Sequence, residues 1–267
     1  KVSGVLIIFS LDVLRGEGVR GRTASSGQRN PEDRPDRVVR PWLILGAGAR
    51  FGLLEGVLRT RVGYAGGTTP DPTYEDIGDH AETLQIDFDP EVITYAELLN
   101  VFWTSHNPAA RPWSTQYRSA IFTADEQQRL AAERSLGKVK EALGGRVFTA
   151  IEPLKRFYPA EAYHQKYYLR QDHVLMTDFT AFFPDEEDFM NSPAAAKVNG
   201  FLSGIGPEEL MRRILPKLGL SAEGNGVSGS EFVEPQNRFH VRALVCALGA
   251  EPVRQKLLPL YDVPLWK

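Results

Sequence analysis

Apolar and polar residues alternate in several short stretches of the chain, which is the pattern of strands with one buried face. Thr83–Phe88 is the clearest case, since its leucine, isoleucine and phenylalanine alternate with polar residues. Alternation, or a high content of β-branched and aromatic residues, predicts further strands. These fall at residues 1–13, Val38–Leu45, Val57–Tyr64, Tyr117–Phe122 and Phe148–Ile151. A turn is expected at Gly46–Gly48, between the second of these strands and a short helix.

Helical spacing is clearest in Tyr95–His106, where large apolar residues recur on one face. Thr94 precedes this segment as a predicted N-cap, and Glu97 stands at the capping-box position. Other segments also have helical spacing or typical helix starts, such as Pro207 followed by two glutamates. The predicted helices are Ala49–Leu54, Thr123–Leu143, Glu186–Gly200, Pro207–Leu218 and Phe239–Leu260.

This succession of strands and helices predicts an α+β fold in which helices pack on a sheet with short, antiparallel connections. Three parts follow from the pattern. Residues 1–41 include an Arg-, Gly- and Pro-rich segment that lacks the apolar content needed to offset chain entropy, so disorder is expected there. Residues 42–171 form the predicted α+β domain, and residues 172–267 form a helical extension.

Composition narrows the class of protein further. With 267 residues, 42% hydrophobic and 24% charged, most of the chain should fold. The net charge of −3 provides no general attraction to nucleic acids or anionic membranes, and we expect neither as a partner. Cys246 is the one cysteine, which excludes an intrachain disulfide and a cysteine-based zinc site. We expect a cytoplasmic monomer.

The stretch from Val62 to Glu82 is typical of a binding site. Gly63, Gly66 and Gly67 allow close approach of the backbone to a ligand, and two prolines fix the path of a loop that displays Tyr74. The sequence His80-Ala81-Glu82 could begin a metal motif, but neither a cysteine pair nor a suitably spaced second histidine completes it. No metal is therefore expected.

Several motifs in this region and beyond it resemble one family. They are GVLRTRVGYAGG (56–67), PTYE (72–75), HAE (80–82), FWTSHNP (102–108), TQYRSAIF (115–122) and FYPAEAYHQKY (157–167). In this order, over roughly residues 49–168, they are similar to peptide methionine sulfoxide reductase A. The resemblance implies a two-layer α/β sandwich with a ferredoxin-like core.

The resemblance also implies a chemistry and a set of site residues. In this family a cysteine thiolate attacks the sulfur of methionine-S-sulfoxide, and a second cysteine and then thioredoxin reduce the resulting sulfenic acid. No bound cofactor is implied. By match to the motifs, Glu82 is the acid, and Tyr74 and Tyr117 hold the sulfoxide oxygen. Gly66, Gly67 and His80 are the expected substrate-binding residues, and the expected partners are methionine-sulfoxide peptides and thioredoxin.

The chain departs from the family's pattern where the nucleophile belongs. Counting back from Phe51 without gaps places the family's GCFW motif on residues 42–45, so Leu43 occupies the cysteine's position. Leucine has no ionisable group and cannot act as a nucleophile. The aromatic wall, the acid-bearing segment before TQYRS and the C-terminal resolving cysteine are also missing. Cys246 lies in an apolar helical context, which is typical of a buried, unreactive thiol.

Three hypotheses follow. The first is a methionine-S-sulfoxide reductase whose nucleophile is supplied from elsewhere. The second is a catalytically inactive relative that binds methionine sulfoxide or a protein partner. The third concerns the sequence itself: residues 1–48 resemble no part of the family, as expected if a wrong exon or a read-through intron had replaced the nucleophile strand.

Overall fold

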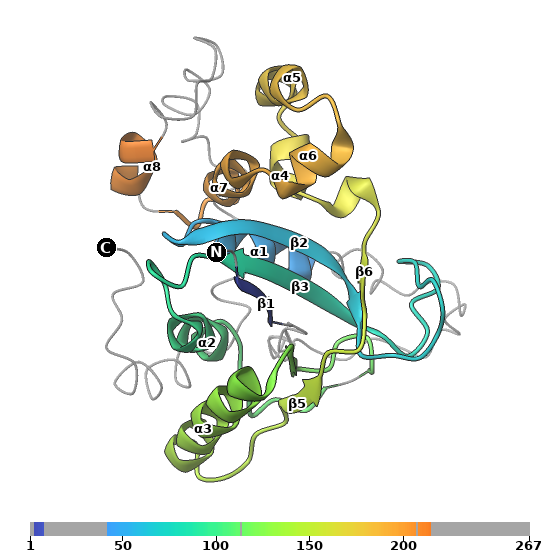
Figure 1. Ribbon diagram of the computed structural model, residues 1–267, viewed down its shortest axis with the longest axis vertical. Coiled ribbons are helices and arrows are strands. Elements are labelled where there is room, and N and C mark those ends of the chain that lie inside the picture. Colours follow the sequence, from blue (N-terminus) through green and yellow to red (C-terminus); the bar gives the residue numbers. More distant parts are fainter. Residues whose placement is uncertain (1–2, 8–41, 113, 207, 215–267) are drawn as a thin grey trace, which may run out of the picture.

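The computed structural model describes residues 3–7, 42–112, 114–206 and 208–214 (Figure 1). Most of the segment expected to be disordered, the predicted helix Phe239–Leu260 and Cys246 lie outside the described residues. The paragraphs below concern the described ranges.

A central antiparallel sheet has the strand order β1-β3-β2-β6 (Figure 1). Strand β4 lies beside β1 and pairs with β5 in a separate parallel ladder. The sheet strands are β1 (Ser3–Ile7), β2 (Val57–Ala65), β3 (Ala81–Phe88) and β6 (Phe157–Pro159), and the parallel pair is β4 (Ala120–Thr123) and β5 (Ala150–Pro153). The expectation of antiparallel connections is therefore wrong for β4 and β5, because the 17-residue helix α3 (Glu126–Ala142) joins them as a crossover.

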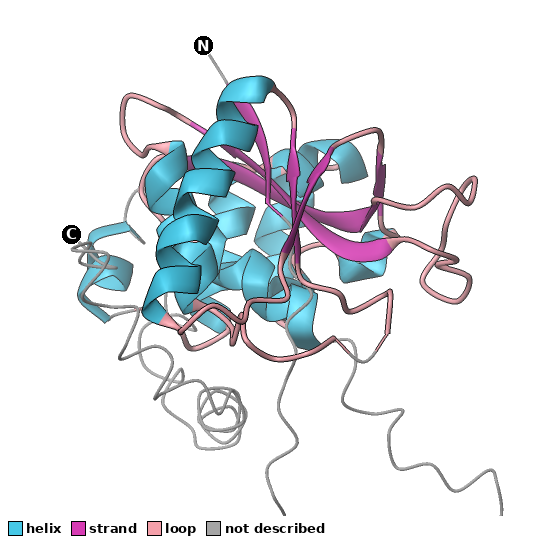
Figure 2. Ribbon diagram, turned by 90° about the horizontal axis from the view of Figure 1, so that it is seen from below, coloured by secondary structure: helices cyan, strands magenta, loops and turns pink. Residues whose placement is uncertain are grey.

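The apolar face of the sheet is covered by α1 (Trp42–Gly52) and α2 (Tyr95–Thr104). Phe51 of α1, Ile86 of β3 and Phe102 of α2 are fully buried in one core. Figure 2 shows helices packed beside the strands. The order β1-α1-β2-β3-α2-β4, with β1 and β3 inside and β4 beside β1, is that of a ferredoxin-like core. The predicted α+β sandwich is thus confirmed.

Helix α1 corrects the prediction of a strand at Val38–Leu45 followed by a turn at Gly46–Gly48. From Trp42 onward the chain is helical, and residues 45–49 are almost completely buried. A short, continuously apolar run is compatible with a buried strand or a buried helix, and periodicity alone does not separate them. The glycines are accommodated because α1 packs closely: a Cβ at Gly48 would lie 3.6 Å from side chains of both β2 and β3.

Five further helices follow β6 and a 3₁₀ turn, η2 (Ala162–His164). They are α4 (Tyr167–Arg170), α5 (His173–Phe182), α6 (Glu186–Asn191), α7 (Pro193–Leu202) and α8 (Glu208–Ile214). The single helix predicted at Glu186–Gly200 is therefore two helices, separated at Ser192. Pro193 disfavours helical backbone at the preceding residue, and the Ser192 hydroxyl accepts a hydrogen bond from Ala195 N (3.1 Å) as the N-cap of α7.

Helix α7 packs directly on α1 (Figure 1). A Cβ at Gly52 of α1 would lie 2.5 Å from the carbonyl oxygen of Ala196, so the two helices meet through their backbones. Lys197 donates to the carbonyls of Gly52 (3.4 Å) and Leu54 (3.1 Å), where the carbonyls at the C-terminus of α1 have no partner within the helix. This part of the extension therefore completes the burial of a core helix.

Two helical glycines test this packing. A methyl group at Gly137 on α3 would have no heavy-atom neighbour within 4 Å, so Gly137→Ala should raise the free energy of unfolding by about 0.5–1 kcal/mol. At Gly200 the same methyl would lie 2.5 Å from Leu53 and 2.7 Å from the Ala49 carbonyl, so Gly200→Ala should lower that free energy by about 1–3 kcal/mol. Urea unfolding of both variants measures the difference. A Gly200→Ala protein as stable as the unaltered chain would contradict the close contact of α7 and α1.

Candidate active site

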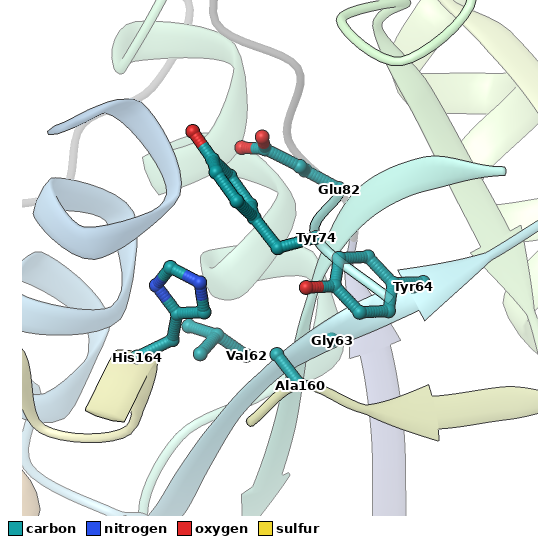
Figure 3. A pocket seen from close by; sticks show the side chains of 7 residues that line it. All are labelled: Val62, Gly63, Tyr64, Tyr74, Glu82, Ala160 and His164. Atoms are coloured by element: carbon teal, nitrogen blue, oxygen red, sulfur yellow. The ribbon is translucent and has the colours of Figure 1, made fainter. Parts of the chain in front are cut away.

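A small open pocket lies where β2, β3 and the segment after β6 come together (Figure 3). The register of the sheet places Tyr64 directly opposite Glu82, so that both project from the same face. The segment after β6 closes the other side of the pocket. The lining residues are Val62, Gly63, Tyr64, Tyr74, Glu82, Ala160 and His164.

Glu82 is the buried carboxyl of this pocket, and its side chain is nearly inaccessible. Gln116 Nε2 donates to Glu82 Oε1 (2.9 Å), and the Tyr117 hydroxyl also hydrogen-bonds to the carboxyl. Burial raises the pKa of Glu82 to about 7, although both hydrogen bonds act to lower it. A carboxyl with this pKa can both hold and release a proton near neutral pH.

Two predicted site residues, Tyr117 and Glu82, are therefore brought into contact. Tyr117 belongs to the turn before β4, because that strand begins at Ala120 and not at Tyr117 as predicted. The backbone holds the turn in place, since Glu82 N donates to the Gln116 carbonyl (3.1 Å). Tyr117 is almost fully buried, so its hydroxyl is fixed beside the carboxyl.

Tyr74 lies on the loop between β2 and β3 and is half-buried. Figure 3 shows its ring at the mouth of the pocket, between Glu82 and His164, with its hydroxyl directed to the same side as the Glu82 carboxyl. The ring centroids of Tyr74 and His164 are 4.8 Å apart. The three predicted groups, Glu82, Tyr74 and Tyr117, thus gather at one site, and their catalytic roles stay a prediction.

Glu161 and His164 belong to the same site and were not among the predicted site residues. Glu161 accepts hydrogen bonds from the Tyr64 hydroxyl (2.7 Å) and from Tyr74 N (2.9 Å). Partial burial acts to raise the pKa of Glu161, but these hydrogen bonds outweigh it and lower the pKa. His164 is 8% exposed, and burial lowers its pKa. The signal in the sequence was the motif FYPAEAYHQKY, which contains both residues.

Gly66, Gly67 and His80 hold the glycine-rich loop in shape. His80 Nδ1 accepts from Gly67 N (3.2 Å), and its Nε2 donates to the Thr69 carbonyl (2.8 Å). Gly66 has a φ of 82°, and a Cβ there would lie 2.0 Å from the Phe122 ring. These three residues lie outside the set that lines the described pocket, and their binding of substrate stays a prediction.

Leu43, which the sequence predicts to occupy the position of the family's nucleophile, falls in the first turn of α1. The described ranges contain no cysteine, because the one cysteine of the sequence is Cys246. Within the same ranges, no group of three or more histidine, cysteine or acidic residues is arranged to hold a metal ion. None of the described helices is long and apolar enough to span a membrane.

This geometry defines the class of the protein. It is a ferredoxin-like α+β protein whose pocket contains a protonatable carboxyl and tyrosines. The family model for peptide methionine sulfoxide reductase matches residues 45–195, more than half of the chain. The chain therefore belongs to the peptide methionine sulfoxide reductase family, as the motifs indicated.

Two relatives that are similar in sequence agree with this assignment. A peptide methionine sulfoxide reductase of Drosophila melanogaster is 41% identical over 66% of this chain and 71% of its own length. Peptide methionine sulfoxide reductase A5 of Oryza sativa is 36% identical over 81% of this chain and 91% of its own length. Among solved structures, reduced Mxr1 from Saccharomyces cerevisiae is 29% identical, with a TM-score of 0.45 over 48% of this chain and 80% of that one.

The raised pKa of Glu82 predicts a pH-dependent stability. Its folded value, about 7, exceeds the ordinary value of 4.5, so the stability that this proton contributes is fully present below about pH 4.5 and is lost as the pH rises through about 7. Glu82→Gln removes the titrating group. Its free energy of unfolding, relative to the unaltered protein, should therefore increase by on the order of 3 kcal/mol across that range. Urea unfolding at a series of pH values measures this, and a difference that stays constant would contradict the raised pKa.

Proposed function

We propose that this protein binds peptides that contain methionine-S-sulfoxide and reduces the sulfoxide to methionine. The observation that carries the proposal is the buried carboxyl of Glu82, with a pKa of about 7, in a pocket beside two tyrosines. Family membership supports the same substrate, because the Drosophila and Oryza relatives are named as peptide methionine sulfoxide reductases.

Glu82 is the proposed acid. The sulfoxide oxygen is a poor leaving group until it is protonated, and a carboxyl that keeps its proton at neutral pH can supply one as the S–O bond breaks. Tyr74 and Tyr117 are the proposed hydrogen-bond donors to that oxygen, and Tyr117 also holds the carboxyl in place. Gly66, Gly67 and His80 contribute by fixing the loop that carries Tyr74.

The reduction needs a thiol. A thiolate attacks the sulfoxide sulfur, the oxygen is transferred to the thiol as a sulfenic acid, and methionine leaves. Cys246 is the only thiol that the sequence contains. The dithiol of thioredoxin then reduces the sulfenic acid, which regenerates the thiol and releases water. A step that depends on thioredoxin suits a reducing compartment, and we propose a monomer acting in the cytoplasm.

A second function is supported by the leucine at position 43. A pocket that keeps the acid but has no thiolate beside it would bind methionine sulfoxide without reducing it. The two functions share the substrate and differ only in turnover, so one assay separates them.

Thioredoxin-dependent turnover of a methionine-S-sulfoxide peptide is the expected result for the full chain. Loss of that turnover in Cys246→Ser would identify Cys246, the one cysteine of the sequence, as the nucleophile. Consumption of NADPH, coupled through thioredoxin reductase, measures the rate. Turnover unchanged in Cys246→Ser would rule out Cys246 as the nucleophile. Peptide binding without any turnover would contradict reduction and support the second function, binding of methionine sulfoxide without reduction.

Binding of the sulfoxide should depend on Glu82. Glu82→Ala removes a buried hydrogen-bonding group, so the Kd for a methionine-S-sulfoxide peptide should rise by roughly tenfold. Glu91→Ala is the matched control, since Glu91 is exposed in the connection that follows the far end of β3. Fluorescence anisotropy with a labelled peptide gives both values. Equal, small effects of the two substitutions would show that the pocket does not bind the sulfoxide.

A further inference from the structure

We propose that the rim of the pocket, formed by Tyr163, Glu75 and Glu161, binds a lysine or arginine side chain next to the methionine sulfoxide. The protein would then select sulfoxides in basic sequence surroundings. This inference rests on the proposed function and adds the class of peptide that the site prefers.

An aromatic row leads from the pocket to the surface. The ring of His164 in the pocket wall lies 4.8 Å from that of Tyr74 and 4.1 Å from that of Tyr163. Tyr163 is 57% exposed although it is a large aromatic residue. A substrate residue beside the sulfoxide would therefore reach an open ring, which offers its face to an apolar or a cationic group.

His164 supplies an independent sign that the row meets a ligand. Its Nε2 atom is buried and has no hydrogen-bond partner among the described residues, and its nearest carboxylate oxygen, Glu161 Oε2, is 3.9 Å away. Buried polar atoms are normally hydrogen-bonded, so an unpaired one in a pocket wall favours a polar group of a bound peptide as its partner.

The charged groups near the Tyr163 ring favour the binding of a cation. Partial burial and then the carboxylates of Glu161 and Glu75 raise the pKa of the Tyr163 hydroxyl, which places both acids within electrostatic range of that ring. No lysine or arginine occurs between Arg61 and Arg111, so the loop that carries Tyr74 adds no basic side chain.

The nearby cations are held elsewhere. Arg156 lies over the Tyr158 ring, 4.5 Å from its centroid. Lys166 is buried and donates to the backbone of Thr60. His164 adds little positive charge at neutral pH, because burial lowers its pKa. The exposed rim thus presents an aromatic face with negative surroundings, which favours an ammonium or guanidinium group.

Three peptides of equal length test the inference on the full chain. Each contains one methionine-S-sulfoxide, flanked on both sides by lysine, glutamine or glutamate. We expect the lysine peptide to bind about two- to fivefold more tightly than the glutamine peptide, and the glutamate peptide to bind most weakly. High salt should reduce these differences. Equal Kd values for the three peptides would overturn the inference and leave the proposed function standing, whereas binding of none of them would overturn both.

Variants at the rim identify the groups responsible. Glu75→Gln and Tyr163→Ala should each reduce the preference for lysine over glutamate by about twofold or more, while the Kd of the glutamine peptide stays nearly unchanged. Tyr163→Phe keeps the ring and should keep the preference. Glu91→Gln removes the same charge at a distant exposed site and should have no effect. A preference for the lysine peptide that survives both Glu75→Gln and Tyr163→Ala would show that the rim does not contact the flanking residue.

Discussion

The burial of one carboxyl, that of Glu82, is the constraint on which the arrangement of the site depends. The carboxyl is held by Gln116 and Tyr117, and no lysine or arginine in the described ranges pairs with it. These donors come from the turn before β4, so the position of this turn relative to β3 is set by hydrogen bonds that converge on one side chain. The register of β2 against β3 adds Tyr64 opposite Glu82, and Tyr64 in turn binds Glu161. Strands, turn and the segment after β6 are therefore connected through a few polar contacts around an otherwise apolar sheet face.

The helices after β6 are part of the same structure and not an appendage to it. Helix α7 buries one side of α1 through backbone contacts, and Lys197 satisfies carbonyls at the end of α1. Lys166, at the start of α4, donates to the backbone of Thr60 on β2. The chain segment that carries position 43 thus depends for its burial on residues about 150 positions later in the sequence. A break near residue 171 would expose the outer side of α1.

Local signals in the sequence were sufficient where one face of an element meets water. The alternation in Thr83–Phe88 predicted β3, and Thr94 and Glu97 form the expected capping box, with Glu97 N donating to Thr94 Oγ1 (3.2 Å). The sequence predicted only the last part of α1, within the helix expected at Ala49–Leu54. The first part was mistaken for a strand because α1 is buried on nearly all sides, so its sequence has no polar face that would reveal the helical period. Strand β6 is three residues long and is defined by its pairing with β2, which no local pattern reveals.

The motifs identified Glu82, Tyr74 and Tyr117 as neighbours, but the link from Tyr64 through Glu161 to Tyr74 spans almost 100 residues and could be found only from the fold.

The energetics of Glu82 bear on what the pocket is for. A buried carboxyl without a cationic partner destabilises the fold at neutral pH, and an apolar residue in its place would avoid that penalty. If close packing were the only requirement at this position, an apolar side chain would meet it. Gln116 and Tyr117 would then have no carboxyl to hydrogen-bond. Groups that reduce stability in this way are typical of functional sites, where a shifted pKa is used. The raised pKa of Glu82 therefore fits the proposed role of this residue as an acid, even though leucine stands at position 43. Under the proposed function, leucine at position 43 changes where the thiol comes from but leaves the proposed proton donor, Glu82, in its buried pocket.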